Sequence, residues 1–244
     1  MTDNNINYRG VKLNSYNQYD ILELIKYNLT NSITLNVFYI NAYLFLSIIK
    51  NKEILKVLND GLLINDGIGM NLLIRILKNN NHVKKTVTTD IWHKVLDLCS
   101  ELKLRIVVYG GERNKRGNIV RFLNQFPGIE LLEYSDGYSN LDITKLKADI
   151  IFVGLGSFKQ ELYIESISDK NNIPIKIAVG SAIDFWTGAK KRAPLWMQKT
   201  GLEWLYRLFQ EPKRLWKRYI IGIPVFMFNI IVIKVKLMLK KEST

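Results

Sequence analysis

Three short apolar runs that end in glycine limit the fold more than any other feature of this sequence. They are RIVVYGG at residues 105–111, DIIFVGLG at 149–156 and IKIAVG at 175–180. Helical patterns follow the first two, at residues 114–126 and 159–168. Buried strands that end in glycine and lead into helices are typical of a parallel α/β sheet. We expect a further strand at residues 33–38, a helix at 67–77 and a surface loop at 78–82.

Positive charge is concentrated in the last part of the chain. The 244 residues hold 35 Lys and Arg against 22 Asp and Glu, a net charge of +13. Residues 190–244 alone hold 13 against 3, a net charge of +10. We therefore expect a nearly neutral body at residues 1–189 and a basic appendage at 190–244. Such an appendage indicates an anionic partner, which is nucleic acid, a phospholipid surface or a phosphorylated substrate.

The appendage carries an apolar run, YIIGIPVFMFNIIVI at residues 219–233, flanked on both sides by Lys and Arg. A membrane-spanning helix needs roughly 20 apolar residues, so this run is too short to span. Pro194, Pro212 and Pro224 are expected to divide the appendage into short helices, such as residues 202–210 and 213–221. An apolar segment with basic residues on both sides is suited to the surface of an anionic membrane. It therefore favours a membrane over nucleic acid as the partner. The alternative is a C-terminal helix packed on the body.

Four aromatic residues of this segment are our candidates for membrane contact: Trp216, Tyr219, Phe226 and Phe228. The first ten residues, MTDNNINYRG, lack a basic region followed by an apolar core, so we predict no secretory signal and a cytoplasmic location. The single cysteine, Cys99, excludes a disulfide within the chain and a zinc site with several Cys ligands. His82 and His93 are isolated, and we predict no metal site.

The glycines at the strand ends have two interpretations. Ligands of parallel α/β sheets bind at the carboxyl ends of strands, where glycine lets the backbone approach a phosphate. Glycine also permits a tight turn without any ligand. The turns at Gly110-Gly111, Gly154-Leu155-Gly156 and Gly180 lack the GxGxxG spacing of dinucleotide-binding proteins and the Walker A pattern. This argues against a nucleotide-dependent oxidoreductase.

Carboxylates near turns are the candidates for acid–base chemistry. Asp66 in LINDGIGM lies between an apolar run and a helix, where it is either a helix cap or a catalytic base. Asp136 in SDGY and Asp184 in AIDFW have the same two interpretations. The Lys159-Gln160-Glu161 sequence opens a helix after a glycine turn, where an amide and an ammonium group suit a sugar or a phosphate.

Longer motifs resemble one family. Residues 178–219 contain RAPLWM, GLEWLYRL and EPKRLWKRY, and upstream stand NDGIGM, YGG, DGY and VGLGSFKQE. These motifs resemble, in order, those of the WecG/TagA/CpsF glycosyltransferases, from about Tyr8 to Tyr219. The resemblance implies a Rossmann-like α/β fold, a parallel sheet with flanking helices, and a basic helical C-terminal appendage that docks on the membrane.

The resemblance also implies an activity. It is the inverting, metal-independent transfer of a sugar from a UDP-sugar to a polyprenyl-diphosphate-linked sugar, without a cofactor. The sugar is N-acetylmannosamine or a related hexose, with glucose or a uronic acid as alternatives, and the product is a teichoic acid or another cell-surface polysaccharide. The expected location is the inner face of the cell membrane. A non-catalytic module that binds anionic membranes stays as an alternative from another class, and self-association of the chain stays open.

By the same resemblance, Asp66 is the general base that takes the proton of the acceptor hydroxyl. By the resemblance, Arg207, Arg214 and either Lys217 or Arg218 are the basic positions of the appendage, and they suit diphosphates. Two departures concern the site: Tyr39 stands where members often have a small hydroxyl residue, and Thr88 replaces a frequent glycine. The candidate substrate-binding residues are Tyr39, Asn41, Thr88, Asp90, Gly110, Gly111, Asp136, Gly137, Gly154, Gly156, Lys159, Gln160, Glu161, Asp184, Arg192, Arg207, Arg214, Lys217 and Arg218.

Overall fold

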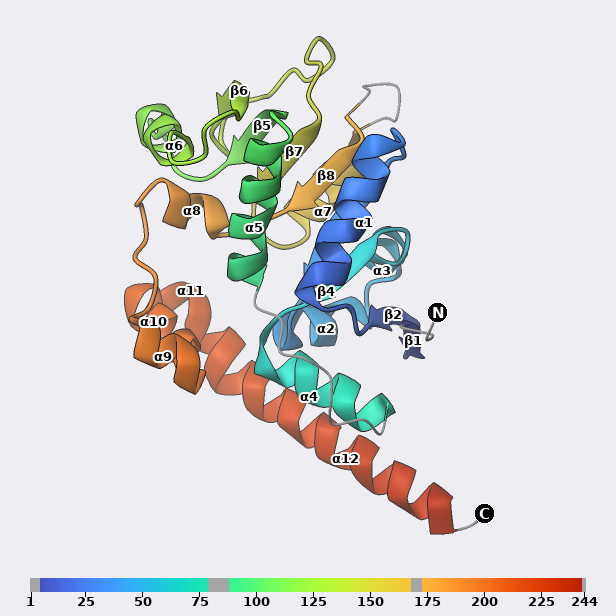
Figure 1. Ribbon diagram of the computed structural model, residues 1–244. Coiled ribbons are helices and arrows are strands. Elements are labelled where there is room, and N and C mark those ends of the chain that lie inside the picture. Colours follow the sequence, from blue (N-terminus) through green and yellow to red (C-terminus); the bar gives the residue numbers. More distant parts are fainter. Residues whose placement is uncertain (1–4, 79–87, 168–172, 243–244) are drawn as a thin grey trace.

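Six parallel strands form the central sheet of the computed structural model, in the spatial order β4-β3-β8-β7-β5-β6 (Figure 1). The structure describes residues 5–78, 88–167 and 173–242, without the side chains of residues 5, 88, 89 and 240–242. The strands are β3 (Leu35–Ile40), β4 (Leu62–Asn65), β5 (Arg105–Gly110), β6 (Glu130–Ser135), β7 (Ile150–Gly154) and β8 (Ile175–Ala178). This confirms the predicted α/β class.

Helices cover both faces of the sheet. One layer contains α1 (Gln18–Thr30), α5 (Thr88–Glu101), α6 (Arg116–Leu123) and α8 (Ala182–Trp186). The other contains α2 (Ala42–Ile48), α3 (Lys52–Asn59), α4 (Gly67–Lys78), α7 (Lys159–Ser166) and α12 (Gly222–Glu242). The small antiparallel hairpin β1 (Asn5–Tyr8) and β2 (Val11–Asn14) lies on this second side.

The two layers explain why the central strands are largely apolar on both faces. Successive side chains of a strand point to opposite faces, so a strand between two helical layers needs apolar residues at every position. In β7, Ile150 and Phe152 belong to the core with α5, whereas Ile151 and Val153 belong to the core with α2. The predicted loop at residues 78–82 lies, apart from Lys78 at the end of α4, outside the described residues.

Glycines at the carboxyl edge are required by close contact between neighbouring strand ends. A Cβ atom on Gly154 would lie 2.6 Å from the carbonyl oxygen of Gly180. A Cβ atom on Gly110 would lie 2.4 Å from the carbonyl oxygen of Gly154. Both distances are far below van der Waals contact, so only glycine fits at residues 110 and 154. For these two positions, the interpretation as tight structural turns is sufficient.

The C-terminal segment forms a series of helices that begins beyond residue 190. It contains α9 (Leu195–Thr200), α10 (Glu203–Gln210), α11 (Pro212–Trp216), a π-helical turn (Lys217–Ile221) and α12. Together, Pro212–Leu239 make one 28-residue helix that is long and apolar enough to cross a membrane by length and composition. The predicted break at Pro224 is therefore wrong, and the helix is longer than the apolar run at residues 219–233 that we expected to be too short to span. A Pro in the helix interior has no backbone N–H to donate. The π-helical turn Lys217–Ile221, just before Pro224, shifts the backbone hydrogen-bond pattern of the helix there.

Helix α12 has one buried face and one exposed face. Phe226, Ile230 and Ile233 are buried in the core with α2 and α4, and the Phe226 ring meets Phe45 edge-on at 5.9 Å. Phe226 therefore does not face outward as predicted, because the body covers it. Figure 1 shows α12 running along α4 and beyond the body. The opposite face exposes Val225, Phe228, Ile231, Val235, Met238 and Leu239.

Candidate active site

A polar cleft, open to solvent, lies between the carboxyl edge of the sheet and the C-terminal helices. The sheet side comes from the ends of β3, β4, β7 and β8, and the other wall comes from α10, α11 and the π-helical turn. The lining residues are Tyr39, Asp66, Trp92, Gly156, Ser157, Val179, Gly180, Ser181, Ala182, Phe185, Lys190, Arg207, Gln210, Glu211, Arg214, Leu215, Arg218 and Tyr219.

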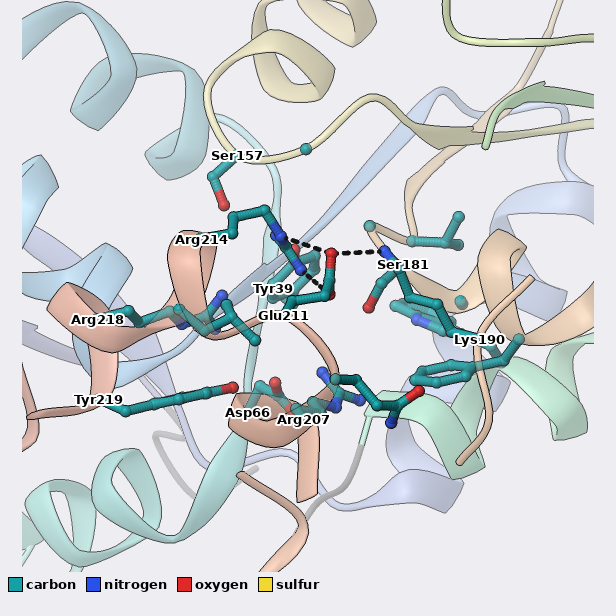
Figure 2. A pocket seen from close by; sticks show the side chains of 18 residues that line it. Tyr39, Asp66, Ser157, Ser181, Lys190, Arg207, Glu211, Arg214, Arg218 and Tyr219 are labelled. Carbon is teal, nitrogen blue, oxygen red and sulfur yellow. Dashed lines mark hydrogen bonds and ion pairs between the residues drawn. The ribbon is translucent and has the colours of Figure 1, made fainter. Parts of the chain in front are cut away.

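Asp66 reaches the cleft from the turn between β4 and α4. Its backbone N–H donates to the carbonyl oxygen of Ile40 at 2.8 Å, which extends the β3–β4 ladder by one bond. This bond fixes the position of the Asp66 backbone, from which the side chain starts. Gly67 follows with φ of +86°, a conformation that strongly favours glycine. The sharp turn ends the strand and leaves the half-buried carboxylate on the wall of the cleft (Figure 2).

Four cationic side chains line the same cleft, all from the C-terminal segment: Lys190, Arg207, Arg214 and Arg218. Figure 2 shows the three arginines around Asp66 and Glu211. The sequence motifs predicted the arginines but left Lys217 and Arg218 as alternatives. The structure separates them, because Arg218 lines the cleft whereas the exposed Lys217 lies over the Trp216 ring at 5.5 Å.

Arg207 is held firmly yet keeps one free donor. Its Nη2 donates to Glu203 at 2.9 Å, and its guanidinium lies 5.1 Å from the centre of the Phe185 ring. Burial acts to lower the pKa of Arg207, but the negative charges of Glu203 and Asp66 outweigh it, and the pKa lies above its usual value. The buried Arg207 Nε has no hydrogen-bond partner among the described residues. Arg207 thus brings a fixed positive charge to the cleft that it lines.

Glu211 joins two of the cations. Its carboxylate accepts from Arg214 Nε at 2.9 Å and Nη2 at 2.5 Å, and Lys190 Nζ lies 3.2 Å from the same group. Lys190 also donates to Asp184 at 2.5 Å, so the predicted Asp184 reaches the cleft wall through this lysine. Neither Lys190 nor Glu211 was among the predicted residues. The run of Lys and Arg at residues 190–192, directly after the body, is the signal that could have indicated Lys190.

Tyr219 belongs to the cleft and not to an outer surface. It is 9% exposed, lines the cleft and meets the Trp204 ring at 5.7 Å. The prediction that it faces a membrane is therefore wrong, because the fold of the appendage turns this side of the helix inward. Trp216, by contrast, is 44% exposed, and Phe228 is 68% exposed.

Several predicted residues lie outside the cleft. Asn41 caps α2 by accepting the Leu44 N–H at 3.0 Å, although its buried Nδ2 has no partner within the described part of the chain. Asp90 forms an ion pair with Arg192 at 2.7 Å, which ties α5 to the start of the C-terminal segment. The side chain of Thr88 lies outside the described residues. Exposed Lys159 opens α7 without lining the cleft.

A second group of predicted residues lies at the far part of the carboxyl edge. Asp136 accepts hydrogen bonds from the Tyr138 N–H and the Ser139 hydroxyl, both at 3.0 Å. The Tyr138 amide in particular holds the pKa of Asp136 below its usual value. Gly137 adjoins the glycines at the strand ends, since its Cβ position is 3.7 Å from Gly110 Cα. Gly110, Gly111, Gly137 and Gly154 are not part of the cleft wall.

The comparison with known sequences decides the family. The sequence model of the glycosyl transferase WecG/TagA/CpsF family matches residues 6–241, nearly the whole chain. The chain belongs to this family. It is therefore a glycosyltransferase, as the motifs predicted, and the cleft is the candidate site of that transfer.

Two relatives agree over almost the whole chain. A protein of Bacillus subtilis (strain 168) is 29% identical over 238 residues, which cover 94% of this chain and 90% of the relative. A protein of Staphylococcus aureus (strain MRSA252) is 27% identical over 250 residues, which cover 96% and 94%. Both are named N-acetylglucosaminyldiphosphoundecaprenol N-acetyl-beta-D-mannosaminyltransferase.

Within the described residues of this chain, His, Cys, Asp and Glu form no group of three or more that could hold a metal ion.

Proposed function

We propose that this glycosyltransferase moves a sugar, N-acetylmannosamine or a related hexose, from a UDP-sugar to a polyprenyl-diphosphate-linked N-acetylglucosamine. The reaction inverts the anomeric carbon and serves the synthesis of a teichoic acid or another cell-surface polysaccharide. One observation carries the proposal: a single cleft places the carboxylate of Asp66 among four cations. The names of the two relatives support the acceptor and the sugar.

In the proposed mechanism, Asp66 is the general base. Its carboxylate takes the proton of the acceptor hydroxyl while that oxygen attacks the anomeric carbon of the donor. The bond between the anomeric carbon and the UDP oxygen breaks, and UDP leaves with the electron pair. Because the attack and the departure occur on opposite faces of the ring, the configuration inverts. The protonated Asp66 later returns its proton to solvent.

The cations stabilise the departing UDP. Negative charge develops on the diphosphate as the bond breaks, and preorganised cationic donors lower the energy of that state. Arg207, Arg214 and Arg218 line the cleft with guanidinium groups that suit phosphate oxygens. We propose that these side chains replace a metal ion, so that no cofactor is needed.

The same helices suit a lipid-linked acceptor. The helices from α10 to the π-helical turn line the cleft on one side and expose Phe209, Trp216 and Ile220 on the other. The outer face of α12 continues this apolar surface, with lysines at residues 234 and 236. Apolar side chains beside basic ones favour the interface of an anionic membrane. We propose that the protein binds peripherally to the cytoplasmic face of the cell membrane.

A donor screen tests the transfer. The protein is incubated with lipid-diphosphate-linked N-acetylglucosamine and one of UDP-N-acetylmannosamine, UDP-glucose or a UDP-linked uronic acid, and products are read by mass spectrometry. We expect one added hexose from one preferred donor, with activity retained in EDTA. Loss of all activity in EDTA would contradict the metal-free mechanism, and no product from any donor would contradict the proposed function.

The Asp66→Asn variant tests the base. An amide cannot accept the proton, so we expect the rate of UDP release to fall by at least about 100-fold. The melting temperature should stay close to that of the wild type. Asp97→Asn is the matched control, since this exposed carboxylate on α5 lies outside the cleft. An Asp66→Asn variant as fast as the Asp97→Asn variant would rule out the base assignment.

A further inference from the structure

A buried polar cluster supports the floor of the cleft. It consists of Tyr39 from β3, Gln160 and Glu161 from α7, and Gly180 from the β8–α8 turn. Gln160 and Glu161 are both 0% exposed, although they stand in the first turn of a helix. Burying an amide and a carboxyl group costs free energy unless hydrogen bonds compensate. The arrangement of their hydrogen bonds therefore indicates what the cluster does.

Gln160 is the centre of the cluster. Its Oε1 accepts the Gly180 N–H at 3.1 Å, and its Nε2 donates to Glu161 Oε1 at 2.9 Å. The Gly180 backbone that Gln160 holds lies against the Tyr39 hydroxyl oxygen. One amide thus links the start of α7 to the β8–α8 turn, and its orientation depends on Glu161 and Gly180. Glu161 fixes the direction of the amide group, because only an acceptor can stand opposite Nε2.

Tyr39 connects this cluster to the cleft. Its side chain lines the cleft together with Asp66 and Arg218. A Cβ atom on Gly180 would lie 2.5 Å from the Tyr39 hydroxyl oxygen, and Gly180 has φ of +54°. Only glycine at residue 180 therefore leaves room for a tyrosine at residue 39. The hydroxyl occupies a defined place against the backbone of the β8–α8 turn.

Glu161 has no evident structural reason to be a carboxylic acid. Its Oε2 is buried and has no hydrogen-bond partner in the described part of the chain. Burial raises the pKa of Glu161, which favours the neutral form. Burial also raises the pKa of Tyr39, which favours the protonated phenol. Both groups are then neutral hydrogen-bonding groups that join the core to the cleft.

We propose that Glu161 is a positioning residue that acts through Gln160 and the Gly180 backbone to hold the Tyr39 hydroxyl in place, and that this hydroxyl contacts the sugar beside Asp66. The contact with sugar rests on the proposed function. A phenol both donates and accepts hydrogen bonds, as recognition of a sugar hydroxyl requires. Tyr39 also fills space that a smaller side chain would leave open, so this residue sets the size of the sugar that enters.

The kinetic test is a double-mutant cycle of Tyr39→Phe and Glu161→Ala. Each single variant should lower kcat by about five- to tenfold, the usual effect of losing one neutral hydrogen bond. KM for the lipid-linked acceptor should change much less. The double variant should be no slower than either single variant, because both changes remove the same contact. Glu161→Gln should stay within about twofold of the wild type, since its amide oxygen still accepts from Gln160.

A second measurement needs no activity. In protein labelled with 15N-glycine, exchange of the Gly180 amide proton should be about tenfold faster in Glu161→Ala than in the wild type, because Gln160 loses its fixed orientation. Tyr39→Phe should leave this exchange close to wild type. Additive kinetic losses, a Tyr39→Phe variant with wild-type kcat, or unchanged Gly180 exchange would each overturn the inference. A wild type inactive with every donor would overturn the proposed function and the sugar contact, while the exchange result still decides the positioning role.

Discussion

Glu211 lies in the cleft beside the cationic side chains that an anionic ligand would bind. Its carboxylate is bound by Arg214 through two nitrogens and by Lys190 at 3.2 Å. Burial acts to raise the pKa of Glu211, but the hydrogen bonds of Arg214 and the charge of Lys190 outweigh it, and the pKa is below its usual value. The group is therefore a carboxylate near neutral pH. A diphosphate that binds these cations has to compete with it.

Replacing Glu211 with Gln should strengthen the binding of UDP. Removing the charge frees Arg214 and Lys190 for phosphate oxygens while the side chain keeps its shape, and we expect the Kd for UDP to fall about fivefold. Isothermal titration calorimetry measures this directly. Glu133→Gln is the control, because Glu133 pairs with Arg116 outside the cleft. An unchanged or higher Kd for Glu211→Gln would show that Glu211 does not compete with the ligand.

The structure brings some of the predicted residues together in the cleft and not others, for a physical reason. Asp66, Tyr39, Arg207, Arg214 and Arg218 come together because each stands at a strand end or on the cleft side of a C-terminal helix. Asn41 also follows a strand, yet its side chain turns back to cap its own helix. A short polar side chain at a strand–helix junction has both options, and spacing along the chain does not distinguish them.

At the scale of elements, long apolar patterns were more informative than short ones. The strands that end in Gly110, Gly154 and Gly180 were predicted almost to the residue. Strands β4 and β6 were not predicted: β4 has only four residues, and β6 carries Glu at two positions as an edge strand. The continuous helix through Pro224 was missed because a π-helical turn before a proline has no clear signal in the sequence.

The two faces of α12 give a matched pair of variants. Phe226→Ala removes a buried ring that packs on Phe45 and Gly69, so we expect the free energy of unfolding to fall by about 3–5 kcal/mol. Phe228 is 68% exposed, and Phe228→Ala should change it by less than about 0.5 kcal/mol. Urea denaturation followed by far-UV circular dichroism measures both. Equal losses would contradict the packing of α12 described above.

At the scale of the whole molecule, charge and exposed apolar surface lie on the same segment. Residues 190–244 hold +10 of the net +13, and the exposed aromatic residues Trp196, Phe209, Trp216 and Phe228 lie in the same part of the chain. A surface that combines both binds an anionic membrane more tightly than a neutral one, and salt weakens it. The charge distribution in the sequence predicted an anionic partner for this segment, whereas the fold showed which of its apolar side chains face outward.

Vesicle binding tests the orientation of that surface. We expect cosedimentation with phosphatidylglycerol vesicles at 50 mM salt, little binding to phosphatidylcholine vesicles, and a clear loss at 500 mM salt. The double change Lys234→Gln and Lys236→Gln should weaken binding to anionic vesicles by about fivefold per lysine. Lys145→Gln with Lys147→Gln is the control, since these exposed lysines lie on the body. Equal weakening by both pairs would place the contact elsewhere.

The division of the cleft between two distant parts of the chain has a consequence for its synthesis. A ribosome that makes about 5–20 residues per second needs about 8–30 s to proceed from Asp66 to Arg218. During that time the nascent chain carries Asp66 and Tyr39 without the complete set of three arginines that line the cleft. Chains that stop early, or that lose residues 207–218 to proteolysis, lack these arginines. The cleft is complete only in molecules whose translation has passed its last lining residue, Tyr219.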